Sequence, residues 1–223
     1  RDMLGRRADG QYDRLLAAIE RDLGPIENIP QRSEELITQA RQQAAPLYEA
    51  AYAAPGASVF NIGDLAARPS MKKALNNAVR IAQEEGRDAA QIGFVFDDAG
   101  NATMTRQPSW QTLDYVKRGL DDVLEGYRDK TTGKLALDTE GKAVNDTLRE
   151  LLSRMDTANP DYAAARAAYA GPAAEREAMR RGQEALRVSP NQLGVNVANS
   201  SPSQVEQMQM GFRSGLADAA GRY

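Results

Sequence analysis

Apolar residues recur at intervals of three and four along most of this chain, the spacing that places side chains on one side of an α-helix. The clearest stripe is formed by Trp110, Leu113, Val116, Leu120, Val123, Leu124 and Tyr127. Similar stripes occur within residues 12–23, 36–51, 71–82, 144–155, 174–186 and 205–219. The pattern predicts an all-α protein, an elongated multi-helix bundle of roughly seven to nine helices.

The composition favours slender helices that pack closely. Hydrophobic residues make up 42% of the 223 residues, but aromatic residues only 6%. The core must therefore be built mostly from aliphatic side chains, methionine and alanine. Alanine is a strong helix former and lets helix axes approach each other closely. Amphipathic stripes with so little aromatic mass can also be completed by a partner chain, so oligomerisation stays open.

One segment departs from the helical spacing. Ile92, Phe94 and Phe96 alternate around Gly93 and Val95, and the sequence DDAGN then precedes residues 102–105. This pattern predicts a small β-hairpin, whose apolar side should lie on helices because an isolated hairpin is only marginally stable. We therefore expect a helical subdomain at 1–90, a hairpin insertion at 91–108 and a second helical subdomain at 109–223, or one continuous domain.

Helix boundaries are marked by proline. Asn159, Ser189 and Ser201 each precede a proline, which suits a capping side chain followed by the first helical residue. Gln192 and Gln204 lie three residues after their serines, as in a capping box. Gly24-Pro25 should end one helix, and Gly171-Pro172 should stop one helix and restart another. At Pro46 a helix either kinks or begins.

The chain has no cysteine and no histidine. Their absence excludes disulfides, zinc sites built from Cys or His, Cys nucleophiles and Ser-His-Asp triads. Paired acids occur at Glu34-Glu35, Glu84-Glu85, Asp97-Asp98 and Asp121-Asp122. Neighbouring residues on a helix do not face each other, so a carboxylate-based cell-wall hydrolase would need acids from different helices. We expect no enzyme, no cofactor and no metal.

Two loops resemble ligand-binding motifs only weakly. Residues 97–101, DDAGN, lack the alternating oxygen ligands and the distant Glu of an EF-hand, so we interpret them as a hairpin turn. Residues 131–134, TTGK, lack the first glycine of a phosphate-binding loop and a preceding strand, so we interpret them as a turn as well.

The charge does not favour nucleic acid over the whole surface, because the net charge is -3 and the pI is near 5.2. Local basic pairs occur at Arg6-Arg7, Lys72-Lys73 and Arg180-Arg181. Acidic neighbours make solvated helix faces the preferred interpretation, but a DNA-contacting module is an alternative if all six lie on one face. No apolar run is long enough to span a membrane. The chain begins with Arg1, which suggests a fragment of a longer protein.

The most distinctive local group is Tyr162, Arg166 and Tyr169 in the segment NPDYAAARAAYAGP. Spacings of four and three place these residues on one helix face, where a guanidinium can stack on an aromatic ring. They form either a helix–helix contact, which we favour, or an interaction face for a partner. In the first case Tyr169→Ala should cost a few kcal/mol of stability.

Four segments carry a family resemblance: RPSMKKALNNAVRIAQEEG, LDYVKRGLDDVLEGYRDKTTGK, LLSRMDTANPDYAAARAAYAGP and MQMGFRSGLADA. They resemble helical regions of large phage and prophage virion-associated proteins, of the internal or DNA-ejection type. The resemblance implies a non-enzymatic structural module of a larger virion protein. It also implies a protein made in the bacterial cytoplasm and carried in the phage particle, with other virion proteins or itself as partners. It supplies no site residues.

Overall fold

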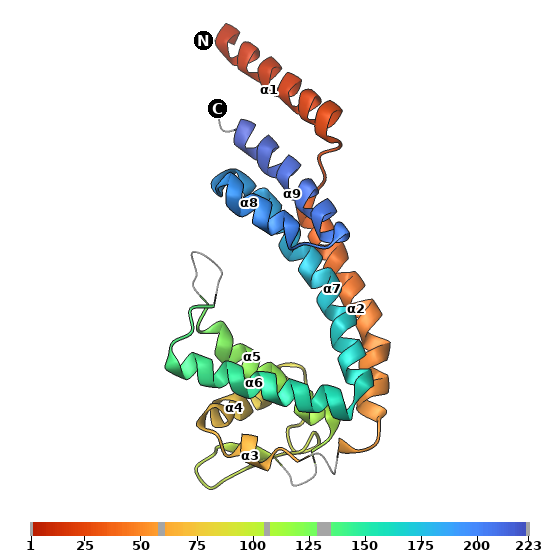
Figure 1. Ribbon diagram of the computed structural model, residues 1–223, viewed down its shortest axis with the longest axis vertical. Coiled ribbons are helices and arrows are strands. Elements are labelled where there is room, and N and C mark those ends of the chain that lie inside the picture. The colour runs from red at the N-terminus through yellow and green to blue at the C-terminus, as the bar shows by residue number, and fades with distance from the viewer. Residues whose placement is uncertain (1, 58–60, 105–107, 129–134, 222–223) are drawn as a thin grey trace. The chain divides into compact units, whose positions relative to one another are not determined.

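The computed structural model describes residues 2–57, 61–104, 108–128 and 135–221, with side chains from residue 10 onward (Figure 1). Within these residues the chain forms nine α-helices, one short 3-10 helix, η2 (Ala185–Arg187), and two strands. The helices are α1 (Asp2–Leu23), α2 (Ile29–Ala53), α3 (Gly63–Ala66), α4 (Pro69–Glu84), α5 (Trp110–Glu125), α6 (Thr139–Ala158), α7 (Pro160–Gln183), α8 (Pro190–Ala198) and α9 (Pro202–Ala220). The predicted all-α class with one small hairpin is confirmed.

The chain divides into two compact units. Unit 1 consists of Arg1–Ala44 and Ala167–Tyr223, and unit 2 consists of Ala45–Arg166. The boundaries fall inside α2 and α7, so each of these long helices contributes to both units. This division differs from the sequence-based one, which placed the boundaries at residues 90 and 108.

Unit 2 is built around the pair α4 and α5, with α6 packed against them (Figure 1). The two helices approach closely at Gly119, where an added Cβ would collide with the backbone carbonyl of Ala74. The largest fully buried side chains of this unit include Trp110, Phe94 and Met71. The apolar stripe predicted for α5 therefore lies in a core.

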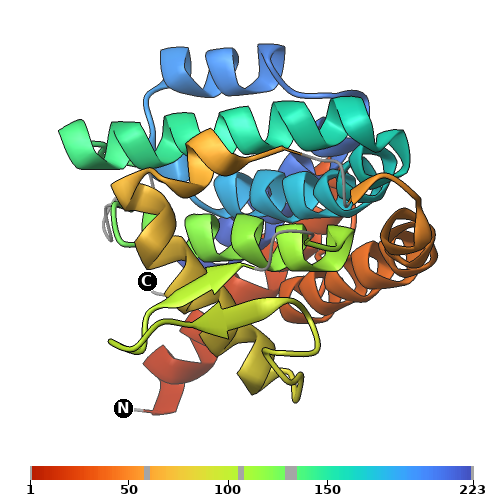
Figure 2. The ribbon, with the colours of Figure 1, turned by 90° about the horizontal axis from the view of Figure 1, so that it is seen from below.

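The hairpin belongs to unit 2 and consists of β1 (Phe94–Phe96) and β2 (Ala102–Met104), antiparallel with Val95 opposite Thr103. Figure 2 shows the strands as two arrows beside α4. The backbone N–H of Ala102 donates to Asn76 Oδ1 of α4 at 2.9 Å, and Phe94 is buried. The expected packing of the hairpin on helices is thus observed.

Unit 1 has a thin core. Among its described residues the buried apolar cluster comprises Ile29, Leu36, Met179 and Met210, and most of its other buried apolar residues are alanines. Glycines bring α7 and α9 together, because an added Cβ at Gly211 would collide with the carbonyl of Met179. The close contact leaves little room for larger side chains between these helices.

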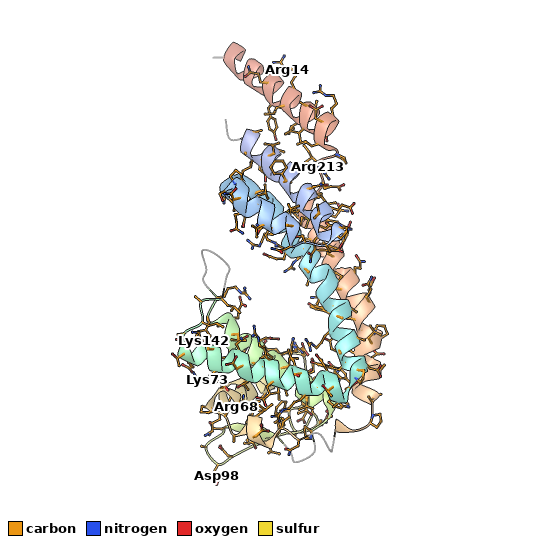
Figure 3. The ribbon with its side chains drawn as sticks, in the orientation of Figure 1. Arg14, Arg68, Lys73, Asp98, Lys142 and Arg213 are labelled. Carbon is orange, nitrogen blue, oxygen red and sulfur yellow. The ribbon has the colours of Figure 1, made fainter. Side chains whose placement is uncertain are left out.

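The end of α1 is fixed by α9. The Nε of Arg213 donates to the carbonyl of Pro25 at 2.9 Å, and its Nη1 donates to that of Leu23 at 3.2 Å. Figure 3 labels Arg213 on α9. As predicted, α1 stops before Gly24, which has the positive φ of 99° that glycine tolerates best.

The predicted caps are also present. Ser189 and Ser201 accept hydrogen bonds from the backbone N–H groups of Gln192 and Gln204. Gln204 completes a capping box, whereas the side chain of Gln192 donates to Asn196 instead. Each cap satisfies a backbone donor that the first helical turn leaves unpaired.

The expected stop and restart at Gly171-Pro172 is wrong, since α7 runs through both residues from Pro160 to Gln183. Proline inside a helix removes one backbone hydrogen bond but does not force an end when packing holds both sides. Pro172 is buried, which supplies that packing. Likewise, α2 continues through Pro46 and does not begin there.

Candidate functional site

The three residues that the sequence predicted to form one group, Tyr162, Arg166 and Tyr169, differ in how deeply they are buried. Tyr162 is 0% exposed and lies in unit 2, whereas Tyr169 is 44% exposed and lies in unit 1. Arg166 places its guanidinium 5.9 Å from the centre of the Tyr162 ring and donates from Nη1 to Asp156 Oδ1 at 2.7 Å. Tyr162 and Arg166 therefore form a packed contact, and Tyr169 does not share it.

Tyr162 belongs to a buried polar group that the sequence analysis did not identify. Its hydroxyl donates to Asp114 Oδ1 at 2.7 Å, and the hydroxyl of Tyr52 donates to Asp114 Oδ2 at 2.9 Å. We call these three residues the Asp114 cluster. It joins α5 to the unit 2 portions of α2 and α7.

The electrostatics of the Asp114 cluster keep its tyrosines neutral. Asp114 is 7% exposed. Burial first, and then the negative charge of Asp114, raise the pKa of Tyr52 and of Tyr162. Both phenols therefore remain protonated donors, and both carboxylate oxygens accept a hydrogen bond. The arrangement makes Asp114 a linkage between helices, satisfied on both of its oxygens.

Asn159 reinforces the same junction. Its Oδ1 accepts from the backbone N–H of Tyr162 at 3.1 Å, and its Nδ2 donates to the carbonyl of Ala51 at 2.9 Å. Asn159 is thus the predicted cap at the start of α7 and also a buried tie to α2. Its side chain uses the donor and acceptor ends of one amide for two helices.

One signal in the sequence points to Asp114. It lies four residues after Trp110 and next to Leu113, on the apolar side of an otherwise well-patterned helix. A carboxylate at such a position needs buried donors. The two donors, Tyr52 and Tyr162, are distant in sequence and cannot be assigned from the spacing within α5.

The predicted basic residues are placed in different environments. Lys73, labelled in Figure 3, lies 2.5 Å from Glu140, and Arg180 pairs with both Glu177 and Glu184 at 2.7 Å. Lys72 is exposed. Arg181 is half-buried, and its Nε is buried without a hydrogen-bond partner in the described part of the chain.

These basic residues are also divided between the units. Lys72 and Lys73 belong to unit 2, and Arg180 and Arg181 to unit 1. Arg6 and Arg7 lie in the backbone span of α1, but their side chains fall outside the described residues. Nearby carboxylates neutralise Lys73 and Arg180, which reduces the positive potential they offer to phosphate.

The acidic residues that occur in adjacent pairs either form ion pairs with basic side chains or accept hydrogen bonds within a turn. Glu85 accepts from Arg118, which lowers the pKa of Glu85, and also from the hydroxyl of Tyr115. Asp97 accepts from the backbone N–H groups of Ala99 and Asn101, so DDAGN forms the expected turn. The loop at 131–134 lies outside the described residues. Across the described part of the chain, no group of three or more acids is placed to hold a metal ion.

The described residues include no helix long and apolar enough to cross a membrane. They do include an apolar groove in unit 1, which we call the α8 groove. Its volume is about 210 Å³. It is lined by Ala185, Leu193, Val197, Val205, Met208, Gln209 and Phe212. In Figure 1, α8 lies beside α9, and no residue of α8 is buried.

Comparisons with protein-family models, with curated proteins and with solved structures gave no match to this chain. The resemblance to phage virion-associated proteins therefore remains a prediction from the sequence.

Proposed function

We propose that this chain is a non-enzymatic structural and interaction module of a phage or prophage virion protein, of the internal or DNA-ejection type. Its partners are other virion proteins or a second copy of itself, and its place is the phage particle. The sequence resemblance supplies the origin. The observation that supports the interaction role is that unit 1 buries few of its large apolar side chains and exposes many.

Unit 1 leaves uncovered many apolar side chains that could pack against a partner. They are Tyr12, Leu15, Leu23, Tyr169, Leu186, Val188, Val195 and Val197. Its buried cluster, by contrast, is small among the described residues. Of the exposed large apolar side chains in the described residues, eight lie on unit 1 and four on unit 2, and unit 1 also has a groove with apolar walls. Such exposed apolar surface is typical of a face that packs against another protein.

The polar interior of unit 2 supports a structural role as well. The side chains of the Asp114 cluster and of Asn159 form hydrogen bonds that join α2, α5 and α7. Side chains fixed in this way stabilise one arrangement of the helices. These contacts serve the packing of helices, as the structural interpretation expects.

The experiment that tests the proposal is mass spectrometry of particles purified from the phage or prophage whose genome encodes this chain. We expect peptides from both units to be enriched in the particles alongside the capsid and tail proteins. An abundant host cytoplasmic protein serves as the contamination control. The proposal fails if peptides of this chain occur in the infected-cell lysate but are depleted from the particles to the level of that control.

A further inference from the structure

The segment that contains α8 differs from the rest of unit 1 in its charge. Residues 188–205 contain no charged side chain, although 26% of the whole chain is charged. The flanking residues are Arg187 and Glu206, so the neutrality ends on both sides. Elsewhere in unit 1 exposed ion pairs are common, for example Arg180 with Glu177 and Arg32 with Glu35.

The groups on this neutral surface are of two kinds. Val195, 52% exposed, and Val197 are aliphatic, and the α8 groove extends the apolar surface toward α9. The polar side chains are amides and hydroxyls, the amides of α8 and its C-cap being Asn191, Gln192, Asn196 and Asn199. An amide carries both a donor and an acceptor, so the same residue on two molecules can pair with itself.

These properties select a particular partner. In a two-fold contact residue i of one molecule meets residue j of the other and the reverse, so only side chains close to the axis face their own kind, and a charged side chain there meets a like charge. A surface of aliphatic, amide and hydroxyl groups avoids that repulsion. We propose that a second copy of this chain packs against α8, with α8 of each molecule lying against α8 of the other beside the two apolar grooves.

This inference rests on the proposed function, because α8 is part of the exposed apolar surface of unit 1 on which that function is based, and the inference names its partner. The size of the surface sets the strength of the contact. α8 spans only nine residues, so the contact is at the small end of specific interfaces, and we expect a weak dimer with a dissociation constant on the order of 10 µM. Two molecules of net charge -3 repel each other weakly elsewhere, so added salt should strengthen the contact.

Sedimentation equilibrium of the 223-residue chain between about 1 and about 200 µM tests this inference. We expect the mass to rise from 24.3 kDa toward twice that value. Val195→Asp puts like charges on facing helices and should weaken the dimer at least about tenfold. Phe96→Asp is the matched control, since Phe96 is 53% exposed in unit 2, and it should leave the dimer unchanged.

A mixture of two oppositely charged variants distinguishes loss of the dimer by charge repulsion from loss by misfolding. Val195→Asp and Val195→Lys should each weaken the dimer at least about tenfold on their own, while an equimolar mixture should restore the original affinity, because opposite charges then face each other. A dimer dissociation constant that Val195→Asp leaves unchanged overturns the assignment to α8. A mass of 24.3 kDa at every concentration overturns the second copy as partner. The proposed function is judged separately, because the chain can still be present in particles with a different virion protein on α8.

Discussion

Asp114 lies where α5 meets the unit 2 portions of α2 and α7, and its two oxygens accept from Tyr52 and Tyr162. At the scale of single residues, such a carboxylate is stabilising only while both donors are present. Loss of one donor leaves a buried charge partly unpaired, which costs more than the hydrogen bond itself contributes.

Tyr162→Phe tests this linkage with the least change in shape. We expect a loss of about 1–3 kcal/mol in the free energy of unfolding, because Asp114 Oδ1 loses its donor. Urea denaturation measures the change. Tyr169→Phe is the matched control on the same helix, and it should change stability by less than about 0.5 kcal/mol because Tyr169 is exposed. Equal effects of the two substitutions would contradict the structural role of the Asp114 cluster.

The same contrast revises the expectation for Tyr169→Ala. The sequence placed Tyr169 in a helix–helix contact and predicted a loss of a few kcal/mol. Since the side chain is exposed, we now expect a change of less than about 1 kcal/mol in the monomer.

Glycine shows how position decides the effect of one methyl group. Gly211→Ala should destabilise the fold by about 1–3 kcal/mol, because its Cβ would collide with the carbonyl of Met179. Gly171→Ala, in the middle of α7 with open space around it, should stabilise the fold by about 0.5–1 kcal/mol. Thermal unfolding of the two variants gives shifts of opposite sign. Shifts of the same sign would contradict the close contact of α7 with α9.

At the scale of elements, an ion pair ties α3 to α6 in unit 2. Arg154 donates to Asp64 at 2.6 Å and also to Glu150. The hydrogen bond from Arg154 lowers the pKa of Asp64 from 3.8 to about 2. A depressed folded-state pKa means that this contribution to stability is fully present above pH 3.8 and is lost as the pH falls toward about 2.

Arg154→Gln should therefore flatten the acid dependence of stability. We expect the difference in melting temperature between wild type and variant to be largest near pH 5 and to shrink as the pH falls toward about 2. Arg176→Gln, an exposed arginine on α7, serves as the control. A gap between wild type and Arg154→Gln that stays constant over this pH range would exclude the ion pair as its cause.

Elements were predictable wherever local chemistry sets them. The caps at Ser189 and Ser201, the end of α1 before Gly24 and the turn at 97–101 depend on residues a few positions apart. The continuous α7 was not predictable, because packing around the buried Pro172 offsets the local preference to stop. The Asp114 cluster was missed for a similar reason, since its members are joined only by the fold.

At the scale of the whole molecule, the two units differ in how fully they bury their apolar residues. Unit 2 encloses Trp110, Phe94 and Met71 in an extensive core, whereas unit 1 relies on a small cluster and on alanine. The sequence stripes of the two units look alike, because a stripe indicates which face is apolar and does not tell what covers it. We infer that unit 1 is completed by a partner.

Hydrogen–deuterium exchange of the dilute chain, at about 0.1 µM and so below the micromolar range in which the proposed dimer forms, tests this central claim most directly. Regions with few buried apolar contacts open at a lower free energy. The account predicts that amides in α1 and α9 of unit 1 exchange at least about tenfold faster than those in α5 of unit 2. Equal protection of these three helices would contradict it, because unit 1 would then be a complete fold without a partner.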